Sequence, residues 1–111
     1  MAISVIVMGA SGRMGSMIIR LVEAADDLKL VAVVDRPEMK ERLAGYAASG
    51  IIVSGDINEV LPQCHGAVVI DFTAPEATMN TARAAVAAGC PVVIGTTGLS
   101  DEQLAELNEL A

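Results

Sequence analysis

Two kinds of apolar segment alternate along the chain. Short runs rich in β-branched residues are followed by longer segments whose apolar residues recur at helical spacing. The short runs are apolar at consecutive positions, which is typical of strands that are covered on both faces in a parallel sheet. We therefore predict five strands, at residues 3–8, 30–34, 51–53, 67–70 and 92–94.

The segment after the first predicted strand indicates an amphipathic helix. Its apolar residues follow the spacing i, i+3, i+4, i+7 and i+8, so they share one helix face, which we expect to supply core or interface packing. The pattern ends near Asp26, where the helix is expected to stop. The predicted packing residues are Met14, Met17, Ile18, Leu21 and Val22.

Two further helices carry capping signals at their amino ends. Thr73 is followed three residues later by Glu76, the spacing of a capping box, and Gly89 is expected to close the alanine-rich helix that follows. Ser100 and Gln103 repeat this spacing before the last helix. The predicted apolar side of that helix is formed by Leu104, Leu107 and Ala111.

The remaining connections are less regular. Residues 36–50 predict a loop with one helical turn at 37–43, and residues 56–61 predict a short helical turn. Strands separated by helices imply right-handed βαβ units. The predicted fold is therefore α/β: one Rossmann-like domain over residues 1–111, with a doubly wound parallel sheet of about five strands in the order 3-2-1-4-5 and helices on both faces.

Composition narrows the possible functions. Acidic residues outnumber basic ones by 14 to 7, so we expect no nucleic-acid partner, and with 2% aromatic residues the chain cannot build a base-stacking platform. Cys64 and Cys90 are too few for a disulfide framework, which indicates reduced thiols in a cytoplasmic protein. Cys64 beside His65 offers only two ligands, so no metal site is expected. The opening apolar run is too short to span a membrane.

Three glycines follow the first predicted strand at every third position, a variant of the dinucleotide-binding fingerprint. We expect Gly9 to allow a tight turn, Gly12 to let a pyrophosphate approach the backbone, and Gly15 to let the helix pack close to the strand. A side chain at Gly12 is also expected to disfavour the backbone angles of the turn. The predicted phosphate-binding residues are Gly9, Ala10, Ser11, Gly12, Arg13 and Met14, the last through its backbone amide.

An acidic residue follows the second predicted strand. Asp35 lies twenty residues beyond Gly15, where a carboxylate accepts hydrogen bonds from the adenosine ribose in NAD-binding domains. Arg36 could pair with the 2′-phosphate of NADPH, or it could be an ordinary solvated loop residue. The expected cofactor is therefore NADH or NADPH.

Polar residues also follow the fourth and fifth predicted strands, and in a parallel sheet these strand ends share one edge. Phe72 and Thr73 follow the fourth strand, and Gly95, Thr96 and Thr97 follow the fifth. The second segment suits the nicotinamide carboxamide and ribose, although an ordinary strand-to-helix turn would have the same composition. Thr73 could also serve only as a helix N-cap.

The motifs together are similar to those of one family. G-A-S-G-R-M-G at 9–15, D-F-T-A-P-E-A-T at 71–78 and V-V-I-G-T-T-G at 92–98 resemble the amino-terminal domain of the 4-hydroxy-tetrahydrodipicolinate (dihydrodipicolinate) reductases of bacterial and plant lysine and diaminopimelate biosynthesis. The resemblance implies NAD(P)H binding by residues 9–14, with Asp35 and Arg36 at the adenosine ribose and residues 95–97 near the nicotinamide. An acidic residue followed by arginine is similar to members that use both NADH and NADPH.

The chain also departs from this family's pattern. Members are longer and carry a His-His-x-x-Lys-x-Asp-x-Pro-Ser-Gly-Thr stretch and an Asn-x-Ser segment that this sequence lacks. We therefore expect a fragment without catalytic residues, inactive alone, that meets a small dicarboxylate substrate only with the missing domain. A full-length member is expected to be a homo-oligomer. The alternatives are a reductase similar to aspartate or homoserine dehydrogenase, and a non-catalytic dinucleotide-binding sensor module.

Overall fold

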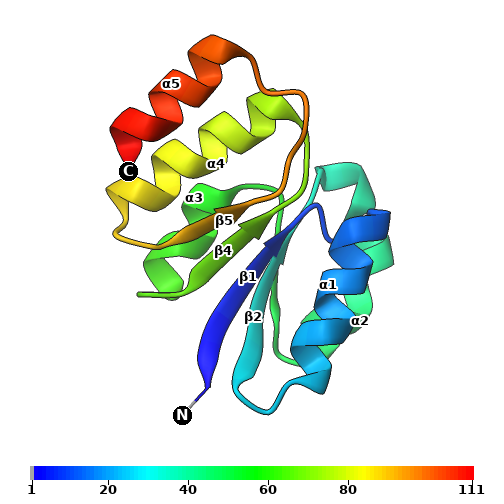
Figure 1. The fold of residues 1–111 in the computed structure, drawn as a ribbon. Coiled ribbons are helices and arrows are strands. Elements are labelled where there is room, and N and C mark those ends of the chain that lie inside the picture. Colours follow the sequence, from blue (N-terminus) through cyan, green and yellow to red (C-terminus); the bar gives the residue numbers. More distant parts are fainter. Residues whose placement is uncertain (1) are drawn as a thin grey trace.

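A computed structural model describes residues 2–111 and contains a five-stranded parallel sheet (Figure 1). The strand order is β3-β2-β1-β4-β5, which confirms the predicted order and the Rossmann-like fold. The second strand begins earlier than predicted because Leu28 continues the ladder opposite Ile3. The strands are β1 (Ile3–Met8), β2 (Leu28–Val34), β3 (Ile52–Ser54), β4 (Val68–Asp71) and β5 (Val92–Ile94).

Helices cover both faces of this sheet. In Figure 1, α1 (Arg13–Ala24) and α2 (Ala44–Ala48) lie on one side, and α3 (Ile57–Val60), α4 (Pro75–Ala87) and α5 (Asp101–Leu110) lie on the other. Each face has its own core. The first core includes Val5, Val7, Ile19, Val22 and Val33, and the second includes Ile6, Val34, Val60, Val69 and Ala85.

The connection between β2 and β3 is more helical than the sequence predicts. The predicted helical turn at 37–43 is confirmed as a 3-10 helix, Pro37–Leu43, and it continues directly into α2, where the sequence predicted a loop. Leu43 is buried and Tyr46 packs against the same core cluster. Two apolar residues one turn apart are too few to produce a recognisable helical period in the sequence. The helix here is stabilised by the packing of these two side chains on the sheet.

The buried face of α1 differs from the predicted one. Met14, Met17 and Leu21 are 44%, 55% and 65% exposed, so these three residues do not pack in the core as predicted. Ile18 and Val22 of the predicted set do pack there, and the buried face carries Gly15, Ile19 and Val22. Gly15 sets this rotation because a Cβ atom there would lie 2.1 Å from the carbonyl oxygen of Gly9, so only a glycine can face the preceding turn at this point.

The caps of the last two helices also require one correction. The N-cap of α4 is Ala74, and Thr73 makes no capping hydrogen bond, because its hydroxyl and amide bond to Asp71 instead. The helix ends as predicted, with Gly89 at a φ of +72° just beyond it. At α5 the predicted capping box between Ser100 and Gln103 is confirmed.

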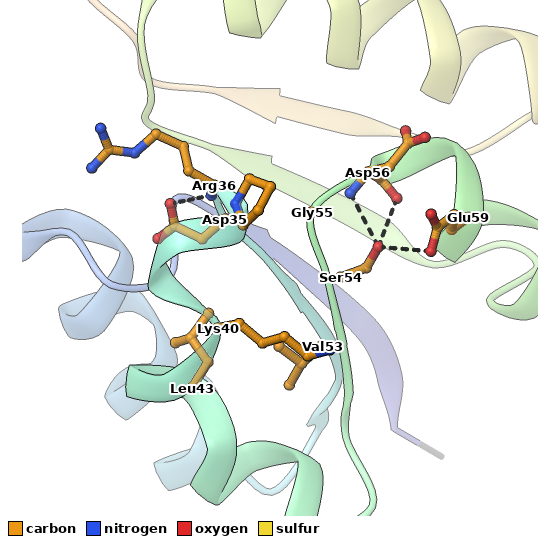
Figure 2. Close-up of a pocket in the computed structure, with 10 residues that line it drawn as sticks. Asp35, Arg36, Lys40, Leu43, Val53, Ser54, Gly55, Asp56 and Glu59 are labelled. Carbon is orange, nitrogen blue, oxygen red and sulfur yellow. Dashed lines mark hydrogen bonds between the residues drawn. The ribbon is translucent and has the colours of Figure 1, made fainter.

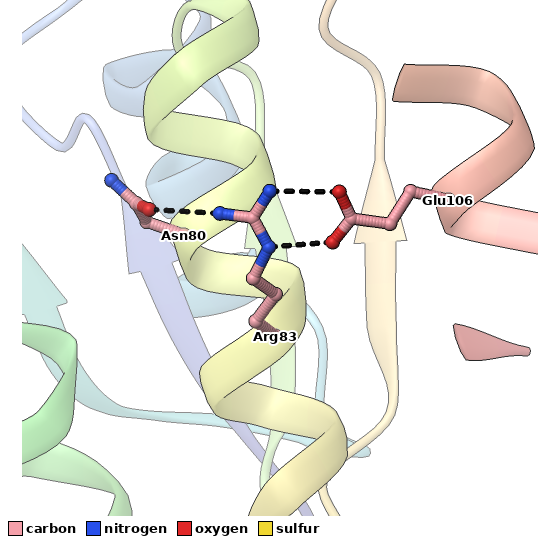
Figure 3. A network of polar contacts seen from close by, with 3 residues as sticks. All are labelled: Asn80, Arg83 and Glu106. Atoms are coloured by element: carbon pink, nitrogen blue, oxygen red, sulfur yellow. Dashed lines mark hydrogen bonds and ion pairs between the residues drawn. The ribbon is translucent and has the colours of Figure 1, made fainter. Parts of the chain in front are cut away.

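The last helix packs on α4 through a face of mixed character, and an ion pair joins the two helices (Figure 3). Leu104 and Ala111 of its predicted apolar side are exposed, and α5 has no fully buried residue. Arg83 of α4 donates from Nε and Nη2 to the two carboxylate oxygens of Glu106, at 2.5 and 2.8 Å. This two-pronged ion pair therefore links α5 to α4 at the surface, beside the half-buried Leu107 and Leu110.

We expect Glu106→Gln to loosen α5. The hydrogen bonds from Arg83 lower the pKa of Glu106 below its ordinary value of 4.5. A carboxyl group with a lowered pKa stabilises the folded form above its ordinary pKa, and that stabilisation is lost as the pH falls through the lowered value. At pH 7, amide hydrogen exchange in α5 should therefore be faster in Glu106→Gln than in the wild type. In the wild type, α5 should lose its protection only under acid conditions. Equal protection of α5 in both proteins at pH 7 would contradict this.

Candidate cofactor-binding site

The turn between β1 and α1 is held against the neighbouring strand. The amide of Gly9 donates to the carbonyl of Val34 at 2.8 Å, and the amide of Gly12 closes the turn on the carbonyl of Gly9 at 3.0 Å. Gly9 has a φ of +67°, a conformation that favours glycine. A Cβ atom on Gly9 would also lie 2.9 Å from the methyl carbon of Thr73, so this turn lies directly against the loop after β4.

Gly12 has a different role from the other two glycines of the motif. Its φ of −74° and ψ of 170° suit any residue, so the expectation of backbone strain from a side chain at this position is wrong. A Cβ atom there would meet only the carbonyl oxygen of Gly9, at 3.3 Å. The fold therefore constrains position 12 much less than positions 9 and 15, which favours a role for Gly12 toward something that approaches the turn from outside.

The amino end of α1 is suited to an anion. No side chain caps this end, and its first turn contains no acidic residue. Its free amides carry the positive end of the dipole of a twelve-residue helix. A shallow groove runs along this end, and it is lined by Ser11, Gly12, Arg13, Ser16, Met17 and Arg20. Two arginines and uncapped amides together favour a phosphate group.

Asp35 follows the end of β2, as predicted, and it is bonded to the glycine turn. Its Oδ2 accepts hydrogen bonds from the amide and hydroxyl of Ser11, at 2.8 and 2.5 Å, and its Oδ1 accepts from the amide of Arg36 at 2.7 Å. Burial raises the pKa of Asp35, but the hydrogen bonds from Ser11 and Arg36 outweigh it and lower the pKa below its ordinary value. The carboxylate is therefore ionised at neutral pH and is available as an acceptor.

A cavity lies beside Asp35, between the 3-10 helix, β3 and α3 (Figure 2). The side chain of Arg36 points away from this cavity, whereas that of Lys40 lies along its wall toward Val53. Asp56 and Glu59 line the opposite side. The sequence analysis did not predict Lys40 as a possible ligand contact. Lys40 lies about one helical turn after Arg36, so it brings a second positive charge to the carboxyl end of β2.

The loops after β4 and β5 meet, as predicted. The amide of Thr73 donates to Oδ1 of Asp71 at 2.9 Å and to the hydroxyl oxygen of Thr96 at 3.0 Å. The ring of Phe72 covers Gly95 so closely that a Cβ atom there would lie 1.9 Å from it. Four of the five predicted residues of this region thus form two contacts between the loops, Phe72 with Gly95 and Thr73 with Thr96.

Two polar residues of this region were not predicted. Asp71 and Thr78 are fully buried, and the hydroxyl oxygen of Thr78 lies 2.6 Å from that of Thr96. Oδ2 of Asp71 has no hydrogen-bond partner among residues 2–111. An unpaired buried polar group costs about 1–3 kcal/mol, so its presence needs an explanation. One feature of the sequence could have pointed to Asp71, because it is an acidic residue at the end of an otherwise apolar strand.

The remaining titratable candidates lie elsewhere. Lys29 and His65 line a groove at the amino ends of the strands, which is the opposite edge of the sheet from the glycine turn, as expected for His65. Lys29 lies within β2, not before it. In the described part of the chain, no three His, Cys, Asp or Glu side chains come together in a way that could hold a metal ion. Cys64 and Cys90 are buried free thiols.

Comparison with known families accounts for nearly the whole sequence. The family model for the amino terminus of dihydrodipicolinate reductase matches residues 3–111. The chain belongs to the dihydrodipicolinate reductase family. This confirms the resemblance inferred from the three motifs. It also favours that family over an aspartate or homoserine dehydrogenase-like reductase.

Curated relatives agree with this assignment. The chain is 56% identical over 111 residues to the 4-hydroxy-tetrahydrodipicolinate reductase of Nitratidesulfovibrio vulgaris, covering 100% of the chain and 42% of the relative. It is 46% identical to the 4-hydroxy-tetrahydrodipicolinate reductase of Acinetobacter baumannii, covering 95% of the chain and 40% of the relative. The chain thus spans about two-fifths of the length of these reductases.

Solved structures agree as well. The dipicolinate-bound dihydrodipicolinate reductase of Paenisporosarcina sp. TG-14 superposes with a TM-score of 0.84 at 27% identity, over 99% of this chain and 43% of that one. The myo-inositol 2-dehydrogenase of Lactobacillus plantarum superposes with a TM-score of 0.80 at 18% identity, over 99% of this chain and 33% of that one, and shows a shared fold. The Rossmann fold and the reductase family together imply a nicotinamide cofactor.

No helix within residues 2–111 has the length and apolar character needed to cross a membrane.

Proposed function

We propose that residues 1–111 are the NAD(P)H-binding domain of a 4-hydroxy-tetrahydrodipicolinate reductase, which reduces 4-hydroxy-tetrahydrodipicolinate to tetrahydrodipicolinate in diaminopimelate and lysine biosynthesis. The observation that carries the proposal is that three loops meet at one edge of the sheet: the glycine turn, the loop after β4 and the loop after β5. Asp35 is bonded to the first of these loops. Ligands of doubly wound sheets bind at this edge, where the strand order reverses between β1 and β4.

Each part of the dinucleotide has a proposed set of contacts. The pyrophosphate would lie on the uncapped amides of α1, held by Gly9, Ala10, Ser11, Gly12, Arg13 and Met14. The adenosine ribose would donate to the carboxylate of Asp35, with Arg36 beside it. The nicotinamide end would lie against the region formed by Phe72, Thr73, Gly95, Thr96 and Thr97. When bound, the reduced cofactor supplies the hydride for the reduction.

Charge at the ribose end supports the use of both NADH and NADPH. Asp35 is ionised and favours a free ribose 2′-hydroxyl, whereas Arg36 and Lys40 favour a 2′-phosphate. The carboxylate of Asp35 is already bound to Ser11, which reduces its repulsion of a nearby phosphate. Neither cofactor is therefore strongly excluded.

The other requirements of the reaction are assigned to the part of the relatives that this chain does not match. That part would hold the proton donor and bind the small dicarboxylate substrate. The full-length protein is proposed to be a homo-oligomer. Buried free thiols at Cys64 and Cys90 support a cytoplasmic location.

The function is tested by titrating the chain with NADH and NADPH in a calorimeter, and by assaying a longer protein that contains this chain for cofactor oxidation with the substrate. Binding of either cofactor to the chain, with turnover only by the longer protein, is the expected result. Oxidation of the cofactor by residues 1–111 alone would contradict it. Binding of cofactor by the longer protein without any reduction of the substrate would instead favour the sensor module.

We expect Arg36→Ala to lower the affinity for NADPH by about tenfold and the affinity for NADH much less. Only NADPH offers a 2′-phosphate for a charge-assisted hydrogen bond with this arginine. The effect is modest because solvent partly screens the charges at an exposed site. Asp35→Ala should shift the preference toward NADPH and weaken both cofactors, since Ser11 loses its partner. Lys29→Ala, at the opposite edge of the sheet, serves as the control for loss of one positive charge. Equal losses of NADH and NADPH affinity with Arg36→Ala would place this arginine away from the ribose.

A further inference from the structure

Hydroxyl groups connect the buried carboxylate of Asp71 to the loop after β5. Oδ1 of Asp71 accepts from the hydroxyl of Thr73 at 2.6 Å, as well as from its amide. The hydroxyl oxygen of Thr73 lies 3.4 Å from that of Thr78, which lies 2.6 Å from that of Thr96. The hydroxyl oxygen of Thr96 accepts from the amide of Thr73 at 3.0 Å. These four residues, Asp71, Thr73, Thr78 and Thr96, form a closed ring of hydrogen bonds, here called the threonine ring.

Asp71 sets the direction of its bond to the hydroxyl of Thr73. That hydroxyl donates to Oδ1 of Asp71 at 2.6 Å, and because a hydroxyl has one proton, it can only accept at its 3.4 Å contact with Thr78. The 2.6 Å bond between Thr78 and Thr96 uses the proton of one of these two hydroxyls and a lone pair of the other. Part of the hydrogen-bonding capacity of Thr96 is therefore used inside the ring, which leaves the hydroxyl of Thr97 and the backbone of residues 95–97 as the freer groups for a ligand.

The ring also determines how the loops lie relative to one another. Thr73 belongs to the loop after β4 and Thr96 to the loop after β5, and the methyl group of Thr73 lies against Gly9 of the glycine turn. Fully buried Asp71 retains an oxygen, Oδ2, without a partner among residues 2–111. A buried polar atom without a partner lowers stability, and this cost favours a functional reason for a carboxylate at this position.

We propose that Asp71 is a positioning residue that, through Thr73, Thr78 and Thr96, holds the loops after β4 and β5 in the arrangement that receives the nicotinamide end of the cofactor. This inference rests on the proposed dinucleotide-binding function and adds residues to it. Asp71 and Thr78 are fully buried, so neither acts by touching the cofactor.

Thr78→Val tests the proposal because valine has the shape of threonine and lacks the hydroxyl. NADH and ADP-ribose are compared as ligands, since ADP-ribose has the same adenosine and pyrophosphate without the nicotinamide. Thr78→Val should lower NADH affinity about threefold to tenfold, the effect of losing one or two hydrogen bonds, and leave ADP-ribose affinity unchanged. Thr78→Ser, which keeps the hydroxyl, should restore NADH affinity.

Ser100→Ala is the control for a purely structural effect. It removes the capping box of α5, so it should lower Tm without changing the ratio of NADH to ADP-ribose affinity. If Thr78→Val lowered the affinities for NADH and ADP-ribose equally, or changed neither affinity, the proposal would be overturned. Equal affinity of the wild type for NADH and ADP-ribose would also overturn it and leave dinucleotide binding intact. No binding of either ligand by the wild type would refute the proposed function itself.

A second measurement does not depend on ligand affinity. The amide of Thr73 donates to both Asp71 and Thr96, so it should exchange slowly with solvent. Thr78→Val should speed its exchange at least tenfold, and Asp71→Asn should do the same, while amides in the centre of β1 remain protected. Unchanged protection of the Thr73 amide in both variants would show that the ring does not hold the loop.

Discussion

Replacing Gly12 with valine is expected to abolish dinucleotide binding and to leave the fold intact. In the described structure a Cβ atom at this position approaches only the carbonyl oxygen of Gly9, at 3.3 Å, and the backbone angles suit a β-branched residue. The valine methyl groups would instead cover the amides at the start of α1, where the pyrophosphate is proposed to lie. We expect at least a hundredfold loss of NADH affinity by calorimetry, with a much smaller drop in Tm than Gly15→Ala causes.

Gly12→Ala provides a graded comparison, since its single methyl group covers less of the same surface and should cause a smaller loss. Gly45→Ala, in α2 and away from the site, should bind NADH like the wild type. If Gly12→Val bound NADH as tightly as the wild type, the assignment of the phosphate site to this turn would be wrong. If Gly12→Val failed to fold, the reading of the turn's geometry would be wrong instead.

Replacing Gly15 with alanine should have the largest effect on stability. Its Cβ atom would lie 2.1 Å from the carbonyl oxygen and 2.8 Å from the carbonyl carbon of Gly9, and 3.0 Å from Cα of Ala10. All three are backbone atoms of a tight turn and cannot move aside as a flexible side chain would. Overpacking of this kind costs about 3 kcal/mol or more, measured as the change in the free energy of unfolding in urea.

Gly45→Ala is a control of opposite sign. Gly45 also lies in a helix, but a Cβ atom there would meet nothing within 4 Å. Alanine should therefore stabilise the protein by about 0.5–1 kcal/mol, because it loses less conformational entropy on folding than glycine. Similar changes in unfolding free energy for the two variants would mean that helix propensity, and not the contact with Gly9, governs position 15.

Much of the candidate site could be predicted because its residues follow strands. In a parallel sheet every strand ends at the same edge, so the alternation of strands and helices already placed Asp35, Thr73 and Thr96 near the glycine turn. The contacts themselves could not be predicted. That Asp35 binds Ser11, and that the amide of Thr73 binds both Asp71 and Thr96, depends on loop conformations that no local pattern specifies.

The sequence by itself determined the strand order, the glycine turn, the Gly89 stop of α4 and the capping box of α5. These features depend on residue types at short fixed spacings, whose conformational preferences act locally. Only the tertiary structure decided which face of α1 is buried, because apolar residues occur on more than one side of that helix and the close contact of Gly15 with Gly9 selects among them. Only the tertiary structure revealed the threonine ring, because its members come from β4, α4 and the two loops and meet only when the sheet has formed.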